Sequence, residues 1–292
     1  MKIFKIISML VALTVATSPV ALAQSKTITV KGSDTMVILG QRWAEVYMKK
    51  NKDVVIQVTG GGSGTGIAAL INKTTDIANS SRPIKDKEKQ QIEGAGAKLI
   101  EVPVALDGLA VYVNSANPIK ELDMETIKLI FTGKIKNWSE LGWDNKVIKL
   151  YSRENNSGTY VYFKEHVLQN EDFDPLAQNM PGTASVLNAV KRDKYGIGYG
   201  GIGYLKGARA ISVSPKAGEK AYEPSMDNVV KGLYPISRYL YIYLTEEQFN
   251  RPEVKAYISW ILSKEGQGIV DKVGFYPIPS KKVQEVRKSL GL

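Results

Sequence analysis

The strongest constraint on the fold is a unit that occurs four times along the chain. In each copy a short β-forming stretch leads into a polar turn of Ser, Thr, Gly or Arg, and an apolar helix pattern follows. The four turns are residues 33–35, 63–65, 80–82 and 157–159. Strands that alternate with helices are typical of an α/β fold, with mainly parallel or mixed sheets flanked by helices. We therefore predict that fold class.

The remaining segments predict two lobes joined by two crossings. Residues 102–113 form a long β pattern interrupted at Asp107 and Gly108, and residues 239–244 form another that carries the chain back. We expect domain I to comprise residues 24–114 and 239–292, and domain II to comprise residues 115–238. The crossings are predicted near residues 113–117 and 234–239. Thr183 is expected to cap a helix of domain II.

The first 23 residues have the pattern of a signal peptide. Lys2 and Lys5 precede an apolar run at residues 6–20, and Ala21-Leu22-Ala23 provides the small residues of a cleavage site. The run is shorter than the roughly 20 residues that span a bilayer. We predict cleavage before Gln24 and release into a periplasm or the medium. Because no Cys follows the cleavage site, no lipid anchor is expected.

The composition excludes several kinds of chemistry. The 292 residues contain no Cys and a single His, and their formal charge is +10. Thiol nucleophiles, Cys-based zinc sites and sites with two imidazoles are therefore excluded. A Ser-His-Asp triad would depend entirely on His166, for which we expect a structural or solvent role. We predict no catalytic residue, no metal and no cofactor, and the excess of positive charge favours anionic partners.

The polar turns predict a site for a small oxyanion. The first N–H groups of a helix lack intrahelical partners, the helix dipole places partial positive charge there, and Ser and Thr hydroxyls add donors. Arg153, four residues before Ser157, adds a guanidinium that matches the oxygens of a phosphate group. The Gly-rich segment 60–66 lacks the Lys-Ser/Thr ending of a phosphate-binding loop, so a nucleotide is not expected.

Other interpretations of single residues stay open at this point. Ser33, Asp34 or Thr35 taken alone is better explained by helix capping than by a ligand contact. Arg82 could equally be a surface charge or the partner of a nearby carboxylate. Only the convergence of several turns would identify a binding site.

Five motifs carry a family resemblance that covers nearly the whole mature chain. They are Gly32-Ser33-Asp34-Thr35, Gly62-Ser63-Gly64-Thr65-Gly66, Asp76-Ile77-Ala78 with Ser80-Ser81-Arg82-Pro83, residues 130–138 (IFTGKIKNW), and Arg153 followed by Ser157-Gly158-Thr159. The sequence resembles the phosphate-binding component of bacterial phosphate ABC importers, which has the type II periplasmic binding-protein fold with its ligand in the cleft between two lobes.

The resemblance implies a set of phosphate contacts. Thr35, Ser63, Ser81, Arg153, Ser157, Gly158 and Thr159 fall at positions where this family contacts phosphate, and Ser33, Arg82 and Asp107 complete the predicted phosphate-binding set. Some members carry Asp at the position of Ser81 to accept the proton of hydrogen phosphate. We expect Asp107 to be the acceptor here, because a carboxylate without that proton would repel sulfate. Asp107→Asn is then expected to lose phosphate-over-sulfate selectivity more than fold stability.

The predicted function is capture of inorganic phosphate by closure of the two lobes, with Arg153 and residues 157–159 closing over the anion. The resemblance implies delivery to a membrane permease of an ABC importer. We expect a monomer that does not bind nucleic acid. Three alternatives remain: a binding protein for sulfate, molybdate or tungstate, an exported enzyme acting on phosphate esters, and a sensory or adhesion protein that binds phosphate without transport.

Overall fold

The computed structural model describes residues 26–205 and 207–292. The predicted signal peptide and its cleavage site lie outside these residues. The strands form one continuous mixed sheet in the order β2-β1-β3-β11-β4-β8-β6-β7, with β9 beside β4 and a separate pair of β5 and β10. The α/β fold with mixed sheets and flanking helices is thus confirmed.

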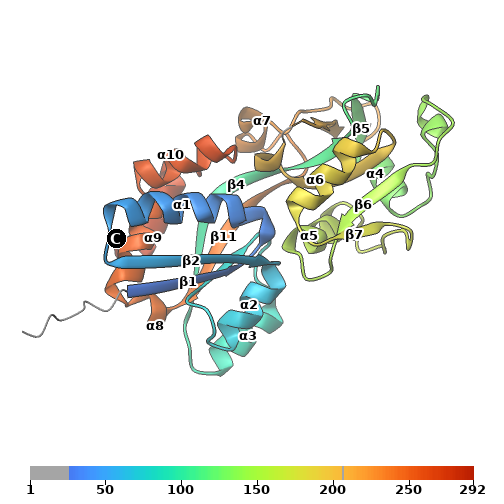
Figure 1. Cartoon of the computed structure of the whole chain (residues 1–292). Helices are drawn as coiled ribbons and strands as arrows, with labels where there is room; N and C mark the ends of the chain where they lie inside the picture. The colour runs from blue at the N-terminus through green and yellow to red at the C-terminus, as the bar shows by residue number, and fades with distance from the viewer. Residues whose placement is uncertain (1–25, 206) are drawn as a thin grey trace, which may run out of the picture.

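One half of the sheet, with its helices, forms the part that we call lobe I (Figure 1, left). Its strands are β1 (Lys26–Gly32), β2 (Val54–Gly61), β3 (Ile77–Ser80), β11 (Ser237–Thr245) and the first part of β4 (Leu99–Val113). Strands β2 and β3 pair with β1 in parallel, whereas β11 is antiparallel to both β3 and β4. The carboxyl ends of β1, β2 and β3 therefore lie at one edge.

The helices of lobe I cover both faces of this half-sheet. They are α1 (Val37–Lys50), α2 (Ser63–Ile71), α3 (Asp86–Gly94), α8 (Glu246–Phe249), α9 (Pro252–Ile261), α10 (Lys264–Val273) and α11 (Ser280–Ser289), with a 3₁₀ turn η1 (Asp34–Met36) before α1. Leu39, Trp43 and Tyr47 recur at helical spacing and form the buried face of α1. The Trp43 ring N–H donates to the Gly266 carbonyl at 2.8 Å, which fixes α1 against α10.

The other half of the sheet forms lobe II (Figure 1, right). Its strands are the last part of β4, β6 (Lys149–Arg153), β7 (Gln178–Met180), β8 (Gly196–Gly201) and β9 (Arg209–Ala210), and the outer pair is β5 (Glu121–Asp123) and β10 (Ser212–Ser214). Its helices are α4 (Met124–Phe131), α5 (Gly158–His166), α6 (Thr183–Arg192) and α7 (Met226–Val230), with 3₁₀ turns η2 (Trp138–Leu141) and η3 (Ile202–Tyr204).

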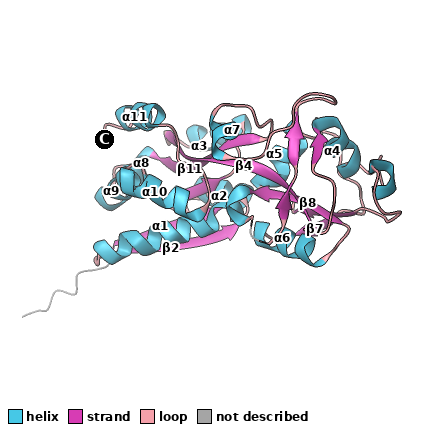
Figure 2. Ribbon diagram, turned by 90° about the horizontal axis from the view of Figure 1, so that it is seen from above, coloured by secondary structure: helices cyan, strands magenta, loops and turns pink. Residues whose placement is uncertain are grey.

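Strand β4 joins the two lobes and changes its partner midway. Its residues up to Gly108 pair with β11, and from Leu109 onward they pair with β8. The predicted interruption at Asp107 and Gly108 is wrong, because both residues keep strand register opposite Arg238 and Ser237. An ion pair between Asp107 and Arg238 lets a carboxylate occupy this buried strand position. Figure 2 shows β4 and β11 running between the two halves.

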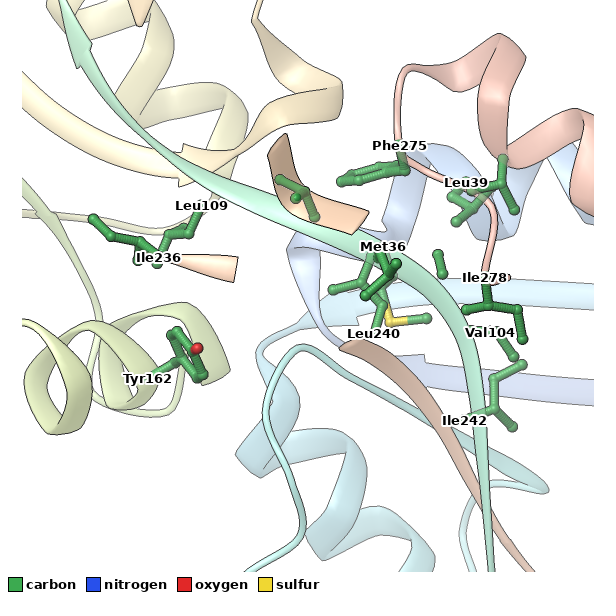
Figure 3. Close-up of a cluster of buried hydrophobic side chains, with 14 of the residues drawn as sticks. Met36, Leu39, Val104, Leu109, Tyr162, Ile236, Leu240, Ile242, Phe275 and Ile278 are labelled. Carbon is green, nitrogen blue, oxygen red and sulfur yellow. The ribbon is translucent and has the colours of Figure 1, made fainter. Parts of the chain in front are cut away.

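A continuous apolar core underlies this crossing (Figure 3). Met36 and Phe275 of lobe I and Leu109 of β4 are fully buried in it. Leu240 of β11 lies in the same cluster. Because a close-packed core resists displacement of its side chains, the two strands form a firm base for the polar groups beside them.

Candidate functional site

The polar turns predicted from the sequence meet where the two lobes face each other. Strand β1 runs into Ser33, β2 reaches Ser63 through Gly62, and β3 is followed by Ser81. In lobe II, β6 ends at Arg153 and α5 begins at Gly158. Ligands of open α/β sheets bind beyond the carboxyl ends of such strands.

Six side chains form what we call the hydroxyl cluster: Ser33, Thr35, Ser63 and Ser81 from lobe I, and Thr159 and Thr183 from lobe II. The Ser33 hydroxyl donates to that of Ser81 at 2.9 Å, and the hydroxyls of Ser63 and Ser81 lie 3.3 Å apart. Across the lobes, the Thr35 hydroxyl is 2.7 Å from that of Thr159 and 3.4 Å from that of Thr183. No member is more than 2% exposed.

The capping interpretation of Ser33 and Thr183 is not supported by their hydrogen bonds. Ser33 precedes η1 without a side-chain cap bond, and its hydroxyl is instead directed to Ser81. The N-cap of α6 is Gly182, whose backbone is extended, so Thr183 is the first residue of the helix. Its hydroxyl is free to accept from Arg153 Nη1 at 3.0 Å.

Ser157 does act as a cap. Its hydroxyl accepts from the backbone N–H groups of Thr159 and Tyr160 at 3.2 and 3.3 Å. These bonds fix the first turn of α5. That turn lies close to the start of α2, because a Cβ atom built on Gly158 would lie 2.3 Å from Ser63 Oγ. Glycine is therefore required at position 158 for the two helix starts to approach, and their partial positive charges face the same cluster.

Arg153 lies at one end of the cluster and is 1% exposed. Its Nη2 donates to Asp34 Oδ2 at 2.7 Å, so an ion pair crosses from lobe II to lobe I. Burial lowers the pKa of Arg153, and the negative charge of Asp34 opposes this shift. The guanidinium stays charged, because the pKa of an arginine side chain lies far above neutrality.

Arg238 lies at the other end, and the sequence reasoning missed it. Its Nη2 donates to Thr159 Oγ1 at 3.0 Å, and its Nη1 donates to the Ser81 carbonyl at 2.7 Å. Nε and Nη2 also donate to Asp107 Oδ2 at 3.1 and 2.9 Å. A charged residue inside an apolar strand pattern, at 236–244, was the one sequence signal that could have found it.

Two predicted site residues do not touch the hydroxyl cluster. Arg82 makes an ion pair with Glu88 at 2.6 Å, and its Nη1 also donates to the Pro83 carbonyl, because the first turn of α3 brings that carboxylate within reach. Arg82 makes no hydrogen bond to the hydroxyl cluster in this structure, so its contact with phosphate stays a prediction. Asp107 reaches the cluster only through Arg238, and its Oδ1 accepts from the Ile202 N–H at 2.9 Å.

The rim of the interface is held by Asn156. This exposed residue of lobe II accepts the Gly64 N–H on its backbone carbonyl at 3.0 Å. Its side-chain amide donates to the Gly61 carbonyl at 3.0 Å and to Thr65 Oγ1 at 3.2 Å. The Tyr204 hydroxyl of lobe II donates to the Asp34 carbonyl at 2.6 Å, and burial raises the pKa of Tyr204 to about 12, so the phenol remains a donor.

His166 is not part of the hydroxyl cluster. His166 is the exposed last residue of α5 and stacks on Tyr162 with ring centres 3.9 Å apart. In the described part of the chain no group of three His, Asp or Glu residues is placed to hold a metal ion. No helix in these same ranges is long and apolar enough to span a membrane.

Comparisons with known proteins agree with this geometry. The model of the PBP superfamily domain matches residues 17–265. The phosphate-binding protein PstS of Pseudomonas aeruginosa is 38% identical over 278 residues, which cover 89% of this chain and 86% of that protein. The PstS protein of Staphylococcus saprophyticus is 32% identical, with 89% and 82% covered.

Solved structures give the same result. A Clostridium perfringens protein, described as a phosphate ABC transporter substrate-binding protein with bound phosphate, superposes with a TM-score of 0.80 at 32% identity. The alignment covers 87% of this chain and 100% of that one. The ABC-type phosphate transport receptor of Vibrio cholerae has a TM-score of 0.69 at 28% identity, with 86% and 100% covered.

The two-lobed fold with a polar cluster between its lobes is that of a solute-binding protein of the PBP superfamily. Within that superfamily, the chain belongs to the family of PstS phosphate-binding proteins.

Proposed function

We propose that this protein binds inorganic phosphate between its lobes and delivers it to the membrane permease of an ABC importer. The observation that carries the proposal is the convergence of six buried hydroxyls, two helix starts and Arg153 at one point between the lobes. A cluster of hydrogen-bond donors of this kind suits a small oxyanion, whose oxygens accept hydrogen bonds in all directions. The names of the relatives support phosphate as that anion.

The binding set follows from the contacts. Ser33, Thr35, Ser63, Ser81, Thr159 and Thr183 would offer hydroxyls, Gly158 its helix N-terminus and Arg153 its guanidinium. Ser157 supports this set as the cap of α5. Because every one of these side chains is buried, an anion bound among them would be enclosed between the lobes.

The contacts of Asp107 change the result that we expect from Asp107→Asn. Its two oxygens accept from Ile202 and Arg238, so Asp107→Asn removes the counter-charge of a buried arginine. Breaking such a pair typically costs about 3–5 kcal/mol. We therefore expect Asp107→Asn to lose more stability than selectivity against sulfate. This is the reverse of the order predicted from the sequence.

The proposal also covers the domain bounds, the closing movement and the mature form of the protein. We keep the predicted domain bounds, residues 24–114 with 239–292 and residues 115–238, as part of this proposal, although β4 passes from lobe I to lobe II somewhat earlier, between Gly108 and Leu109. We also propose that bending of β4 and β11 closes the lobes. The mature protein would begin at Gln24, carry no lipid anchor, act as a monomer without nucleic acid, and have no enzymatic activity.

Calorimetric titration of the mature protein against phosphate, sulfate, molybdate and tungstate tests the proposal. We expect saturable binding of phosphate at one site per chain, with much weaker binding of the other three anions. If sulfate, molybdate or tungstate bound more tightly than phosphate, that anion would be the ligand instead. The absence of heat with phosphate would contradict the proposal.

A further inference from the structure

We propose that Arg238 is a second arginine of the anion site, in direct contact with the bound phosphate, and that Asp107 is its positioning residue. This inference deepens the proposed function and rests on it. It starts from the position of Arg238, which is 5% exposed at the junction of the two lobes and bonded to groups on both.

The hydrogen bonds of Arg238 leave one donor without an acceptor. A guanidinium has five N–H groups. Four bonds are made: Nε and Nη2 to Asp107, Nη2 to Thr159 Oγ1 and Nη1 to the Ser81 carbonyl. One N–H of Nη1 therefore has no acceptor among the described residues. A buried donor of this kind is costly unless a ligand satisfies it.

Arg153 shows the same arrangement at the opposite end of the hydroxyl cluster. Its Nε donates to the Met180 carbonyl, Nη2 to Asp34 and the Pro181 carbonyl, and Nη1 to Thr183. Here too one N–H of Nη1 is left over among the described residues. Each arginine is paired with one aspartate and bonded to one hydroxyl of the cluster, so an anion among these hydroxyls would meet a guanidinium on each side.

Asp107 and Tyr162 fix the direction of Arg238. Asp107 is completely buried, and its Oδ2 holds the Nε edge of the guanidinium. The Tyr162 ring lies against the guanidinium at 5.3 Å from its centre, a cation–π contact, and the Tyr162 hydroxyl is anchored on the Ser237 carbonyl at 2.7 Å. The Nη1 side is thereby turned toward Ser81.

The position of Arg238 also connects the anion to the crossing between the lobes. Arg238 lies opposite Asp107 in the register of β11 and β4, and Asp107 is two residues before Leu109, the first residue of β4 that pairs with β8. It bonds the Ser81 carbonyl in lobe I and the Thr159 hydroxyl in lobe II. An anion that binds Arg238 would therefore favour the arrangement in which both lobes are in place.

The experiment compares three variants by phosphate calorimetry and by melting temperature without phosphate: Arg238→Gln, Arg238→Lys, and the double variant Arg238→Gln with Asp107→Asn. The matched control is Arg251→Gln with Asp76→Asn, an arginine–aspartate pair that reaches the start of β1 through the Thr27 carbonyl, away from the cluster. Wild-type protein that fails to bind phosphate would overturn the proposed function, which separates that failure from a failure of this inference.

We expect Arg238→Gln to lose stability, because Asp107 is left unpaired, and the double variant to regain most of it. The double variant should still bind phosphate on the order of 10- to 100-fold more weakly than wild type, because a lost bond to a charged ligand has that effect. The control should keep wild-type affinity. Arg238→Lys should fold but remain weakened, because an ammonium cannot serve Asp107, Thr159 and the anion together. Phosphate affinity within about twofold of wild type in the double variant, or in folded Arg238→Lys if the double variant does not fold, would overturn the inference.

Discussion

At the scale of single residues, two hydroxyls of the candidate site bond other side chains instead of capping helices. Ser33 and Thr183 stand where helices begin, yet their hydroxyls point to Ser81 and Arg153. Thr35 is central, because its hydroxyl approaches those of Thr159 and Thr183 in the opposite lobe.

Thr35→Val tests this role with a side chain of the same shape. The variant removes one hydroxyl from the cluster, and phosphate affinity should fall roughly 10- to 100-fold in calorimetry. Thr75→Val is the matched control, because the buried Thr75 hydroxyl bonds only the backbone carbonyls of Thr29 and Ile77. The control should lose about 1 kcal/mol of stability and no affinity. Equal affinities of Thr35→Val and wild type would remove Thr35 from the site.

Arg82 and Arg238 show what could and could not be predicted about single residues from the sequence. The turns that contain Ser33, Ser63 and Ser81 were predictable, because local residue types define a strand followed by a polar turn. Which arginine lies beside the hydroxyl cluster depends on the carboxylate that each one meets in the fold. Arg82 pairs with Glu88, six residues along the chain, whereas Arg238 is held near the cluster by Asp107, 131 residues away.

At the scale of elements, the site depends on two helix starts that approach closely. Gly158 opens α5 and meets Ser63, the first residue of α2. The sequence predicted both helices, and the family resemblance implied that their starts meet at one anion. The residue pattern alone could not give this approach, because it follows from the change of partner along β4.

Gly158→Ala tests the approach of α2 and α5. The added Cβ would lie 2.3 Å from Ser63 Oγ and 2.8 Å from Ser63 Cβ. Overpacking of this degree should weaken phosphate binding about 10- to 100-fold. The melting temperature without phosphate should hold, because alanine favours the helix. Gly182→Ala, whose Cβ would meet nothing within 4 Å, is the control. Unchanged affinity in Gly158→Ala would show that closure does not bring these helix starts together.

The link between β3 and α3 gives a pH-dependent prediction. Burial raises the pKa of Glu88, but the hydrogen bonds from Arg82 and the Lys85 N–H outweigh this and hold that pKa below its usual 4.5. The pair therefore contributes stability above about pH 4.5, and this contribution is lost as the pH falls through the lowered pKa.

Melting temperatures of Glu88→Gln and wild type should thus converge below pH 4.5. Above that pH the variant should be less stable. Glu93→Gln, which removes an exposed partner of Lys89, should follow the wild-type profile. A constant difference between Glu88→Gln and wild type from pH 3 to pH 7 would contradict the assignment.

At the scale of the whole molecule, the lobes are joined by groups that do not belong to the hydroxyl cluster. Asn156 bonds Gly61, Gly64 and Thr65 at the rim, and Arg153 pairs with Asp34. Such contacts favour the closed arrangement whichever anion is bound, so they set affinity rather than selectivity.

Asn156→Ala tests this division. The variant loses two side-chain hydrogen bonds between the lobes, and phosphate affinity should fall about tenfold. The ranking of phosphate, sulfate, molybdate and tungstate should not change. Asn155→Ala, at the neighbouring exposed position, serves as control. A changed anion ranking in Asn156→Ala would place Asn156 in the binding site itself.

A crystal structure of the mature protein grown with phosphate would show whether the hydroxyl cluster holds the anion. We predict one phosphate enclosed between the starts of α2 and α5, within hydrogen-bond distance of the hydroxyls of Thr35 and Thr159 and of Arg153. Phosphate density found only on the outer surface, with the hydroxyl cluster occupied by water, would contradict the account.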